Sequence, residues 1–240
     1  MQTFSKTDTG RARNTNQDYV FCQENAVGRF PNLFIVADGM GGHNAGDTAS
    51  RIAVEKVLEQ IAKSDKITPV GIWEEAVECA NEGVYSMSKS DIALEGMGTT
   101  LVGVTVFGDT AYVANIGDSR LYLLSESFVQ VTEDHSLVGE MVRSGQLAKD
   151  EMRTHPNKNV ITRALGTTPT VHADCFEIGI KPGDVILLCS DGLCNMLDDN
   201  VIQSILENNR GNAQQAVEEL ICSANEAGGK DNISVILINL

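Results

Sequence analysis

The sequence predicts an α+β fold, built as a layered sandwich of antiparallel strands and paired helices. Short apolar runs rich in valine, isoleucine and phenylalanine recur along the chain, and several are separated only by tight turns such as Phe107-Gly108-Asp109-Thr110. Such turns are typical of antiparallel hairpins. Helical periodicity occurs in pairs of segments between groups of strands, whereas a doubly wound parallel sheet would alternate single strands with single helices.

Local patterns predict the individual elements. Apolar residues at helical spacing predict helices around residues 49–61 and 73–87. Asp198 or Asp199 can cap a third helix, and Asn212 can cap a fourth. Apolar, β-branched runs bounded by turn residues predict strands over residues 18–22, 33–37, 99–107, 110–116, 120–124, 128–132, 171–178, 184–189 and 233–240.

Nothing in the chain marks a domain boundary, since no low-complexity tract, linker or internal repeat interrupts it. Residues 1–240 are therefore predicted to form a single domain, a length that can bury a substantial core. Residues 136–168 are less regular, because a short amphipathic helix carrying Leu137 and Val142 is followed by a polar stretch. We expect this segment to leave the sandwich as a flap.

The composition argues against several classes of function. The net charge of −15 disfavours nucleic acid or an anionic membrane as a partner, because both attract basic surfaces. No apolar run approaches a membrane span of about 20 residues, and the N-terminal residues lack a signal peptide, so we expect a cytoplasmic protein. The six cysteines form no C-x-x-C pair and are predicted to be buried as small apolar side chains.

Aspartates are placed at the ends of predicted strands. Asp38, Asp118 and Asp191 each follow an apolar run, whereas Asp18 and Asp231 lie at or just before the start of one. If the last two predicted strands pair antiparallel, Asp231 and Asp191 meet at one edge of a sheet. The same matching of ends would bring Asp18 near Asp38.

Carboxylates gathered in this way repel one another, and each uncompensated buried one would cost several kcal/mol. A hard divalent cation with oxygen ligands, Mg²⁺ or Mn²⁺, is the usual remedy. Zinc is a poor candidate because the sequence lacks clusters of histidine or cysteine. An Asp-Gly pair taken alone is a common turn signal, but turns do not require strand-end carboxylates at matched ends.

Short motifs that span nearly the whole chain occur in a defined order: Arg13-Asn14-Thr15-Asn16-Gln17-Asp18, Val36-Ala37-Asp38-Gly39-Met40-Gly41-Gly42-His43, Gly98-Thr99-Thr100, Gly117-Asp118-Ser119-Arg120, Asp134-His135-Ser136, Ser190-Asp191-Gly192-Leu193 and Gly229-Lys230-Asp231-Asn232. In this order they resemble the metal-dependent serine/threonine phosphatases of type 2C, most closely the bacterial branch. The resemblance implies a four-layer α-β-β-α sandwich, in which helices flank two antiparallel sheets, with the metal site at one edge.

The resemblance also implies the ligands of the metal. Asp18, Asp38, Asp191 and Asp231 are similar to the family's ligands for two tightly held Mg²⁺ or Mn²⁺ ions. The backbone carbonyl of Gly39 is expected to join them. Asp118 resembles a ligand of a third, more weakly held ion.

Two further residues are candidates for catalysis. Arg13 matches the arginine that grips the substrate phosphate, and its planar guanidinium suits bidentate binding. His43 is a candidate general acid for the leaving group. Animal relatives have a histidine directly after Asp-Gly, where this chain has Met40, so His43 is also a candidate for a supporting role in the glycine-rich loop. A water bridging two metal ions would attack phosphorus.

The implied activity is removal of phosphate from phosphoserine and phosphothreonine in proteins, the substrates of a bacterial serine/threonine kinase. The alternative is a catalytically inactive phospho-recognition or metal-sensing module on the same fold. A cysteine phosphatase would need Cys-x5-Arg, and a haloacid-dehalogenase type would need Asp-x-Asp after its first strand. The sequence contains neither motif at the required place.

Overall fold

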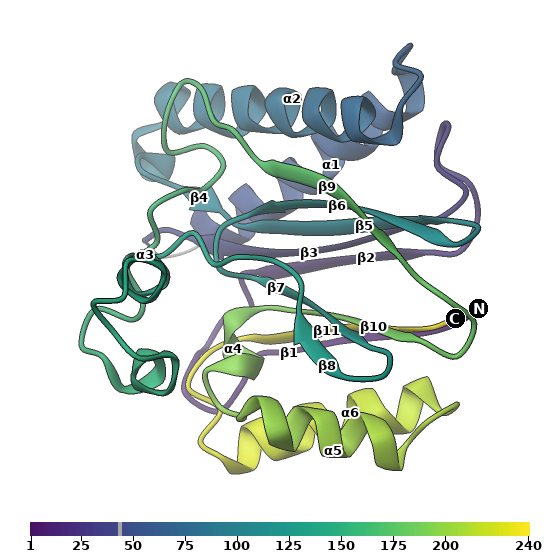
Figure 1. Ribbon diagram of the computed structural model, residues 1–240. Helices are drawn as coiled ribbons and strands as arrows, with labels where there is room; N and C mark the ends of the chain where they lie inside the picture. Colours follow the sequence, from purple (N-terminus) through teal and green to yellow (C-terminus); the bar gives the residue numbers. More distant parts are fainter. Residues whose placement is uncertain (43–44) are drawn as a thin grey trace.

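The computed structural model describes residues 1–42 and 45–240 and has four layers (Figure 1). Two antiparallel sheets are stacked face to face, and a pair of helices covers the outer face of each. The predicted α-β-β-α sandwich is therefore confirmed. In the described residues, no helix is both long and apolar enough to cross a membrane.

The first sheet contains the first and the last strand of the chain as neighbours. Its order is β1 (Gln2–Asp8), β11 (Ile233–Asn239), β10 (Val185–Cys189), β7 (Arg120–Leu124) and β8 (Phe128–Gln130). Its outer face is covered by α5 (Asp199–Asn208) and α6 (Ala213–Glu226). Asp198 occupies the N-cap position of α5 without a capping hydrogen bond from its side chain, whereas the side chain of Asn212 caps α6 by accepting from Gln215 N. A single turn of helix, α4 (Asp191–Cys194), follows β10 directly.

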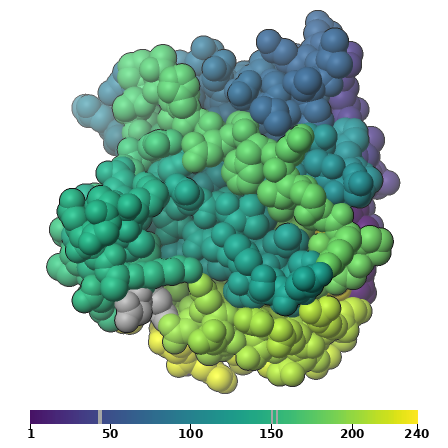
Figure 2. Space-filling model, in the orientation of Figure 1, coloured from purple at the N-terminus to yellow at the C-terminus, as the bar shows by residue number. Residues whose placement is uncertain are grey.

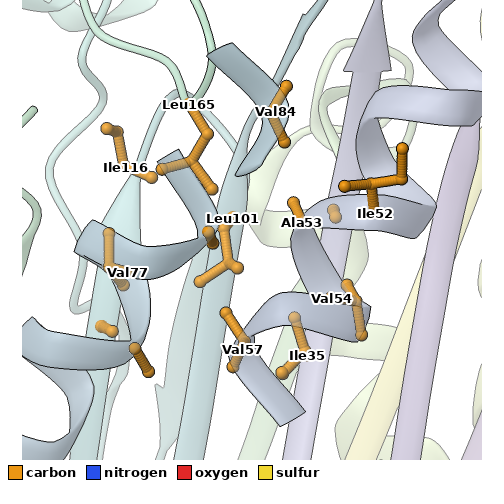
Figure 3. Packing of buried hydrophobic residues seen from close by; sticks show 14 of the residues in the cluster. Ile35, Ile52, Ala53, Val54, Val57, Val77, Val84, Leu101, Ile116 and Leu165 are labelled. Atoms are coloured by element: carbon orange, nitrogen blue, oxygen red, sulfur yellow. The ribbon is translucent and has the colours of Figure 1, made fainter. Parts of the chain in front are cut away.

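The second sheet has the order β2 (Asp18–Gln23), β3 (Leu33–Met40), β5 (Leu101–Phe107), β6 (Thr110–Ile116) and β9 (Asp174–Gly179), with the short β4 (Gly98–Thr99) paired to β3. The long helices α1 (Ala45–Lys63) and α2 (Pro69–Ser90) cover its outer face, and η1 (Ile92–Leu94) follows α2. Figure 3 shows Val57 and Val77 from these helices beside Ile35 and Leu101 from the strands.

Apolar side chains project from both faces of the central strands. On β10, Ile186 and Leu188 enter the layer between the sheets, whereas Val185 and Leu187 pack against the outer helices. Because both faces are buried, these strands carry continuous apolar runs rather than the alternation of a strand with one wet face. This explains why the strands at the centre of each sheet are easily recognised from sequence.

Differences from the predicted elements occur where the local signal is weak. The strand β1 was not predicted, because it is largely polar and partly exposed, and its order comes from pairing with β11. The strand β3 continues to Met40, so Asp38 lies within the strand and not after it. The strand β9 begins later than predicted, at Asp174.

Residues 136–168 form a lobe at the end of the sandwich away from the two chain termini (Figures 1 and 2). The lobe contains α3 (Leu137–Arg143), which matches the predicted short helix, and the 3-10 helix η2 (Lys149–Thr154). The lobe narrows at a base where Leu137 N donates to Val160 O at 2.8 Å. Ser136 and Ile161 form an isolated bridge at the same place. Beyond this base the chain returns to the sandwich, with Leu165 bridged to Thr99.

Candidate metal centre and active site

The antiparallel register brings the predicted acids to one edge of both sheets. Asp18 on β2 lies directly opposite Asp38 on β3. In the other sheet, Cys189 is paired with Val235, and Ser190 N donates to Ser234 O at 3.1 Å. Asp191 therefore lies beside the residues that lead into β11, which include Asp231. The two pairings that the sequence analysis assumed are both present.

Asp118 reaches this edge through a turn between β6 and β7. The turn depends on Gly117, whose φ of +103° favours glycine, and where a Cβ would approach the side chain of Thr100 to 2.6 Å. Asp118 is buried beside the ion pair of Arg120 and Asp134. In that pair, Arg120 Nη2 lies 2.7 Å from Asp134 Oδ2, and Arg120 Nε adds a bond of 2.9 Å to Oδ1.

Close packing of backbone positions the strand that carries Asp38. Gly39 N donates to Gln17 O at 3.1 Å, and a Cβ at Gly39 would collide with the backbone of Gly46. Asp38 N donates to Thr100 Oγ1 at 3.0 Å. Only glycine at position 39 allows β2, β3 and the start of α1 to come this close. We call Asp18, Asp38, Asp118, Asp191 and Asp231 the acidic edge.

Burial and mutual repulsion disfavour ionisation of four of these acids, Asp18, Asp38, Asp118 and Asp191. Burial raises the pKa of Asp18 to about 7, and the charge of Asp191 adds to this. Burial also raises the pKa of Asp191 to about 6, with Asp231 as the next cause. The pKa values of Asp38 and Asp118 are raised well above the ordinary range, first by burial and then by neighbouring carboxylates. A positive charge at this edge would relieve all of these penalties.

Oxygen atoms without partners point to the same conclusion. Among the described residues, Oδ1 of Asp18, Asp118 and Asp191 is buried and accepts no hydrogen bond. The second oxygen of Asp18 accepts from Ser190 Oγ at 2.8 Å, and that of Asp191 accepts from Asn195 Nδ2 at 2.8 Å. Unpaired carboxylate oxygens are the donor atoms that Mg²⁺ and Mn²⁺ prefer. The residues therefore fit a hard divalent cation.

The side chains are nevertheless not drawn into a compact cage. Within the described part of the chain, no group of three or more histidine, cysteine, aspartate or glutamate side chains has the geometry of a formed metal site. Asp231 Oδ2 accepts from Arg13 Nη2 at 2.8 Å, a contact that a bound cation would replace.

Arg13 lies at the rim of the acidic edge. Its side chain is 52% exposed, although its guanidinium contacts Asp231. The preceding residues are anchored, since the amides of Arg11 and Ala12 donate to Gly229 O at 2.8 and 3.0 Å. The structure thus places a fixed backbone and an accessible guanidinium beside the carboxylates. His43 lies outside the described residues, so its predicted role stays a prediction.

A small cavity next to the acidic edge contains residues that the sequence analysis did not assign. It is lined on one side by Asp118 and Asp191, and on the other by Met152 and Lys158 from the lobe. Burial is the main cause of the raised pKa of Asp191, and the nearby ammonium of Lys158 lowers that pKa. No local signal distinguishes Lys158 in a polar stretch. Asn195 could have been found from its helical spacing to Asp191, had the short α4 been predicted.

Comparison with known proteins identifies the family. The family model described as protein phosphatase 2C matches residues 9–222. The chain belongs to the protein phosphatase 2C family. The prediction of a type 2C phosphatase is thereby confirmed, and the chain is a phosphatase of a metal-dependent family.

Relatives over nearly the full length support the assignment. The serine/threonine phosphatase stp of Listeria monocytogenes is 39% identical over 97% of this chain and 93% of its own. Protein phosphatase PhpP of Streptococcus pneumoniae is 40% identical, covering 98% of this chain and 95% of its own. The structure of the S. agalactiae serine/threonine phosphatase has a TM-score of 0.90 at 36% identity, covering 100% and 99% of the two chains.

A further solved relative contains metal. The catalytic domain of the serine/threonine protein phosphatase PstP, in complex with two manganese ions, has a TM-score of 0.85 at 29% identity. The comparison covers 98% of this chain and 96% of that one.

Proposed function

We propose that this type 2C phosphatase removes phosphate from phosphoserine and phosphothreonine in proteins at its acidic edge, with Mg²⁺ or Mn²⁺ as cofactor. The observation that carries the proposal is the set of buried carboxylate oxygens without partners, on strands that antiparallel pairing brings together. The inactive phospho-recognition module gains no support, because Arg13 and all five acids are present at one site.

The residues divide into two groups by their role. Asp18, Asp38, Asp191 and Asp231, with the carbonyl of Gly39, would hold two ions tightly. Asp118 would bind a third more weakly. When bound, such ions lower the pKa of water and offset negative charge on a phosphoryl group.

Arg13 would bind the substrate phosphate. Its guanidinium can donate two parallel hydrogen bonds to phosphoryl oxygens, and these strengthen as charge develops on them. Its contact with Asp231 at 2.8 Å means that the guanidinium can reach the acidic edge. Because the side chain is half exposed, it can turn towards a phosphate without moving the backbone.

The test is phosphate release from an aryl phosphate and from a phosphothreonine peptide, with Mn²⁺ and with excess chelator. We expect activity only with the metal, and nearly complete loss in Asp191→Asn. Asp109→Asn is the matched control, because Asp109 is exposed in the turn before β6, at the opposite end of that strand from Asp118. Activity that survives complete chelation would refute the metal-dependent mechanism.

We also propose that the substrates are products of a bacterial serine/threonine kinase in the cytoplasm, and that residues 136–168 act as a flap that influences which of them bind. The named relatives are bacterial serine/threonine and protein phosphatases, and the lobe forms one wall of the cavity beside Asp118. Phosphoproteomes of strains with and without the gene would identify the substrates. An unchanged set of phosphoserine and phosphothreonine sites would contradict the proposal.

A further inference from the structure

His135 lies where the lobe of residues 136–168 joins the sheet, and it is only 2% exposed. Its backbone carbonyl accepts from Thr162 N at 2.8 Å, so the residue connects the outgoing and returning ends of the lobe. His135 belongs to the motif Asp134-His135-Ser136, but the sequence alone indicates no role for it. The contacts of its backbone and ring indicate a role in positioning the neighbouring turn.

Both the backbone and the side chain of His135 bind a single residue in the turn that carries Asp118. His135 N donates to Gly117 O at 2.9 Å. In return, Gly117 N donates to His135 Nδ1 at 3.2 Å. The peptide groups on either side of Gly117 are therefore both fixed, one residue before Asp118. Gly117 lacks a side chain, so its backbone groups are what His135 binds. The same turn also contains the hydrogen bond between Ser119 Oγ and Thr100 Oγ1 at 2.7 Å.

The far side of the ring fixes its tautomer. Because Nδ1 accepts a hydrogen bond, the proton of a neutral imidazole is on Nε2, which donates to Asp174 Oδ2 at 3.0 Å. Arg163 Nη1 donates to the other oxygen of Asp174 at 3.2 Å. Arg163 also lies 3.4 Å from Nε2, but two donors cannot form a hydrogen bond with each other. Asp174 thus orients the imidazole ring so that the acceptor atom Nδ1 faces Gly117 N.

We propose that His135 is a positioning residue for Asp118, and that through it the base of the lobe sets the affinity of the acidic edge for its outer, third cation. The inference rests on the proposed function, in which Asp118 binds that cation. Oδ1 of Asp118 is buried and accepts no hydrogen bond, so a shift of the turn would move a candidate ligand atom. Partners that orient a metal ligand typically change metal affinity about 10- to 100-fold when removed.

Two substitutions separate the contacts of the ring. In His135→Asn the amide oxygen takes the place of Nδ1 and can accept from Gly117 N, but the side chain does not reach Asp174. In His135→Gln the amide reaches towards Asp174, but nothing replaces the acceptor at Nδ1. His172→Asn is the control, since His172 is exposed and makes none of these contacts.

The readout is Mn²⁺ bound per chain, measured by equilibrium dialysis without substrate, together with thermal unfolding of each variant. We expect the outer dissociation constant to rise about tenfold or more in His135→Gln and to stay within about threefold of wild type in His135→Asn. The two inner ions should be unchanged in both variants. Unchanged outer binding in His135→Gln would overturn the inference, as would equal weakening in both variants in proportion to their loss of thermal stability.

A parallel titration of Asp118→Asn separates this inference from the function on which it rests. Loss of the outer ion in Asp118→Asn with none in His135→Gln would refute only the role of His135. Retention of the outer ion in Asp118→Asn would refute the proposed ligand set and the inference together.

Discussion

Replacing Asp18 by asparagine should stabilise the metal-free protein while destroying its metal site. Burial raises the pKa of Asp18 from the ordinary 3.8 to about 7, so the folded protein opposes ionisation of this group. The difference corresponds to about 4 kcal/mol, because each tenfold change in proton affinity is about 1.36 kcal/mol. Asparagine is neutral at every pH and can still accept the hydrogen bond from Ser190 Oγ.

The sign of the effect depends on pH. Below pH 3.8, Asp18 is protonated in the folded and unfolded chains, and the substitution should change little. As pH rises towards 7 the folded chain binds more protons at Asp18 than the unfolded chain, so the wild-type protein loses stability. Above pH 7 the full penalty of about 4 kcal/mol is present, and Asp18→Asn escapes it.

Urea unfolding in excess chelator at pH 4.5 and pH 8 measures this difference. At pH 8 the unfolding midpoint of Asp18→Asn should exceed that of wild type by about 1.5 M, for a denaturant dependence of about 3 kcal/mol/M. Asp109→Asn controls for the loss of one negative charge at an exposed site. Excess Mn²⁺ should reverse the order, because each of the two inner ions, at about 100-fold above its dissociation constant, adds about 2.7 kcal/mol to wild type, and together they exceed the penalty of about 4 kcal/mol. A gain that is the same at both pH values would refute the reasoning.

Three further substitutions test other parts of the structure. Arg13→Ala should raise KM by about tenfold or more with a smaller effect on kcat, because a charge-assisted contact to phosphate is worth about 1.5–3 kcal/mol; an unchanged KM would remove Arg13 from phosphate binding. Lys158→Met should tighten Mn²⁺ binding at the acidic edge by at most about fivefold, since it removes a competing positive charge of modest strength; weaker binding in dialysis would contradict this. Gly103→Ala should cost about 1–3 kcal/mol of stability in urea unfolding, because its Cβ would lie 2.5 Å from the ring of Trp73. Gly179→Ala is its control, with no atom within 4 Å of the added carbon, and equal losses in both would show that crowding is not the cause.

The parts of the fold that the sequence predicts well are those with a strong local signal. The strands β6 and β7 have the bounds expected from their apolar runs, because buried central strands are apolar on both faces. The starts of α5 at Asp198 and of α6 at Asn212 were equally readable, because aspartate and asparagine favour the N-cap position, although only the side chain of Asn212 makes the capping hydrogen bond. The strand β1 carries no such signal, because its order comes from a partner more than 200 residues away.

The candidate site likewise has one part that the sequence predicts and another that it does not. Aspartates at strand ends are visible in the sequence, and assuming antiparallel pairs was enough to bring four of them together. Contacts between distant segments are not visible. The bond from Gly117 to His135 joins residues 18 apart, and the approach of Lys158 to Asp191 depends on how the lobe folds back. Neither follows from periodicity or spacing.

The position of β11 between β1 and β10 has a consequence for biosynthesis. Residues 2–8 have no strand to pair with until residues 233–239 have left the ribosome, so this sheet closes only after β11 has been synthesised. Such late, long-range pairing is slow and leaves strand edges exposed in the meantime. Asp231 and Asn232 directly precede this last strand and are synthesised with it. Asn232 Nδ2 then fixes the loop before β2 by donating to the carbonyls of Thr9 and Thr15 at 2.9 Å each. The sheet that carries Asp191 and the loop that carries Arg13 are therefore completed only once residues 231–239 are in place.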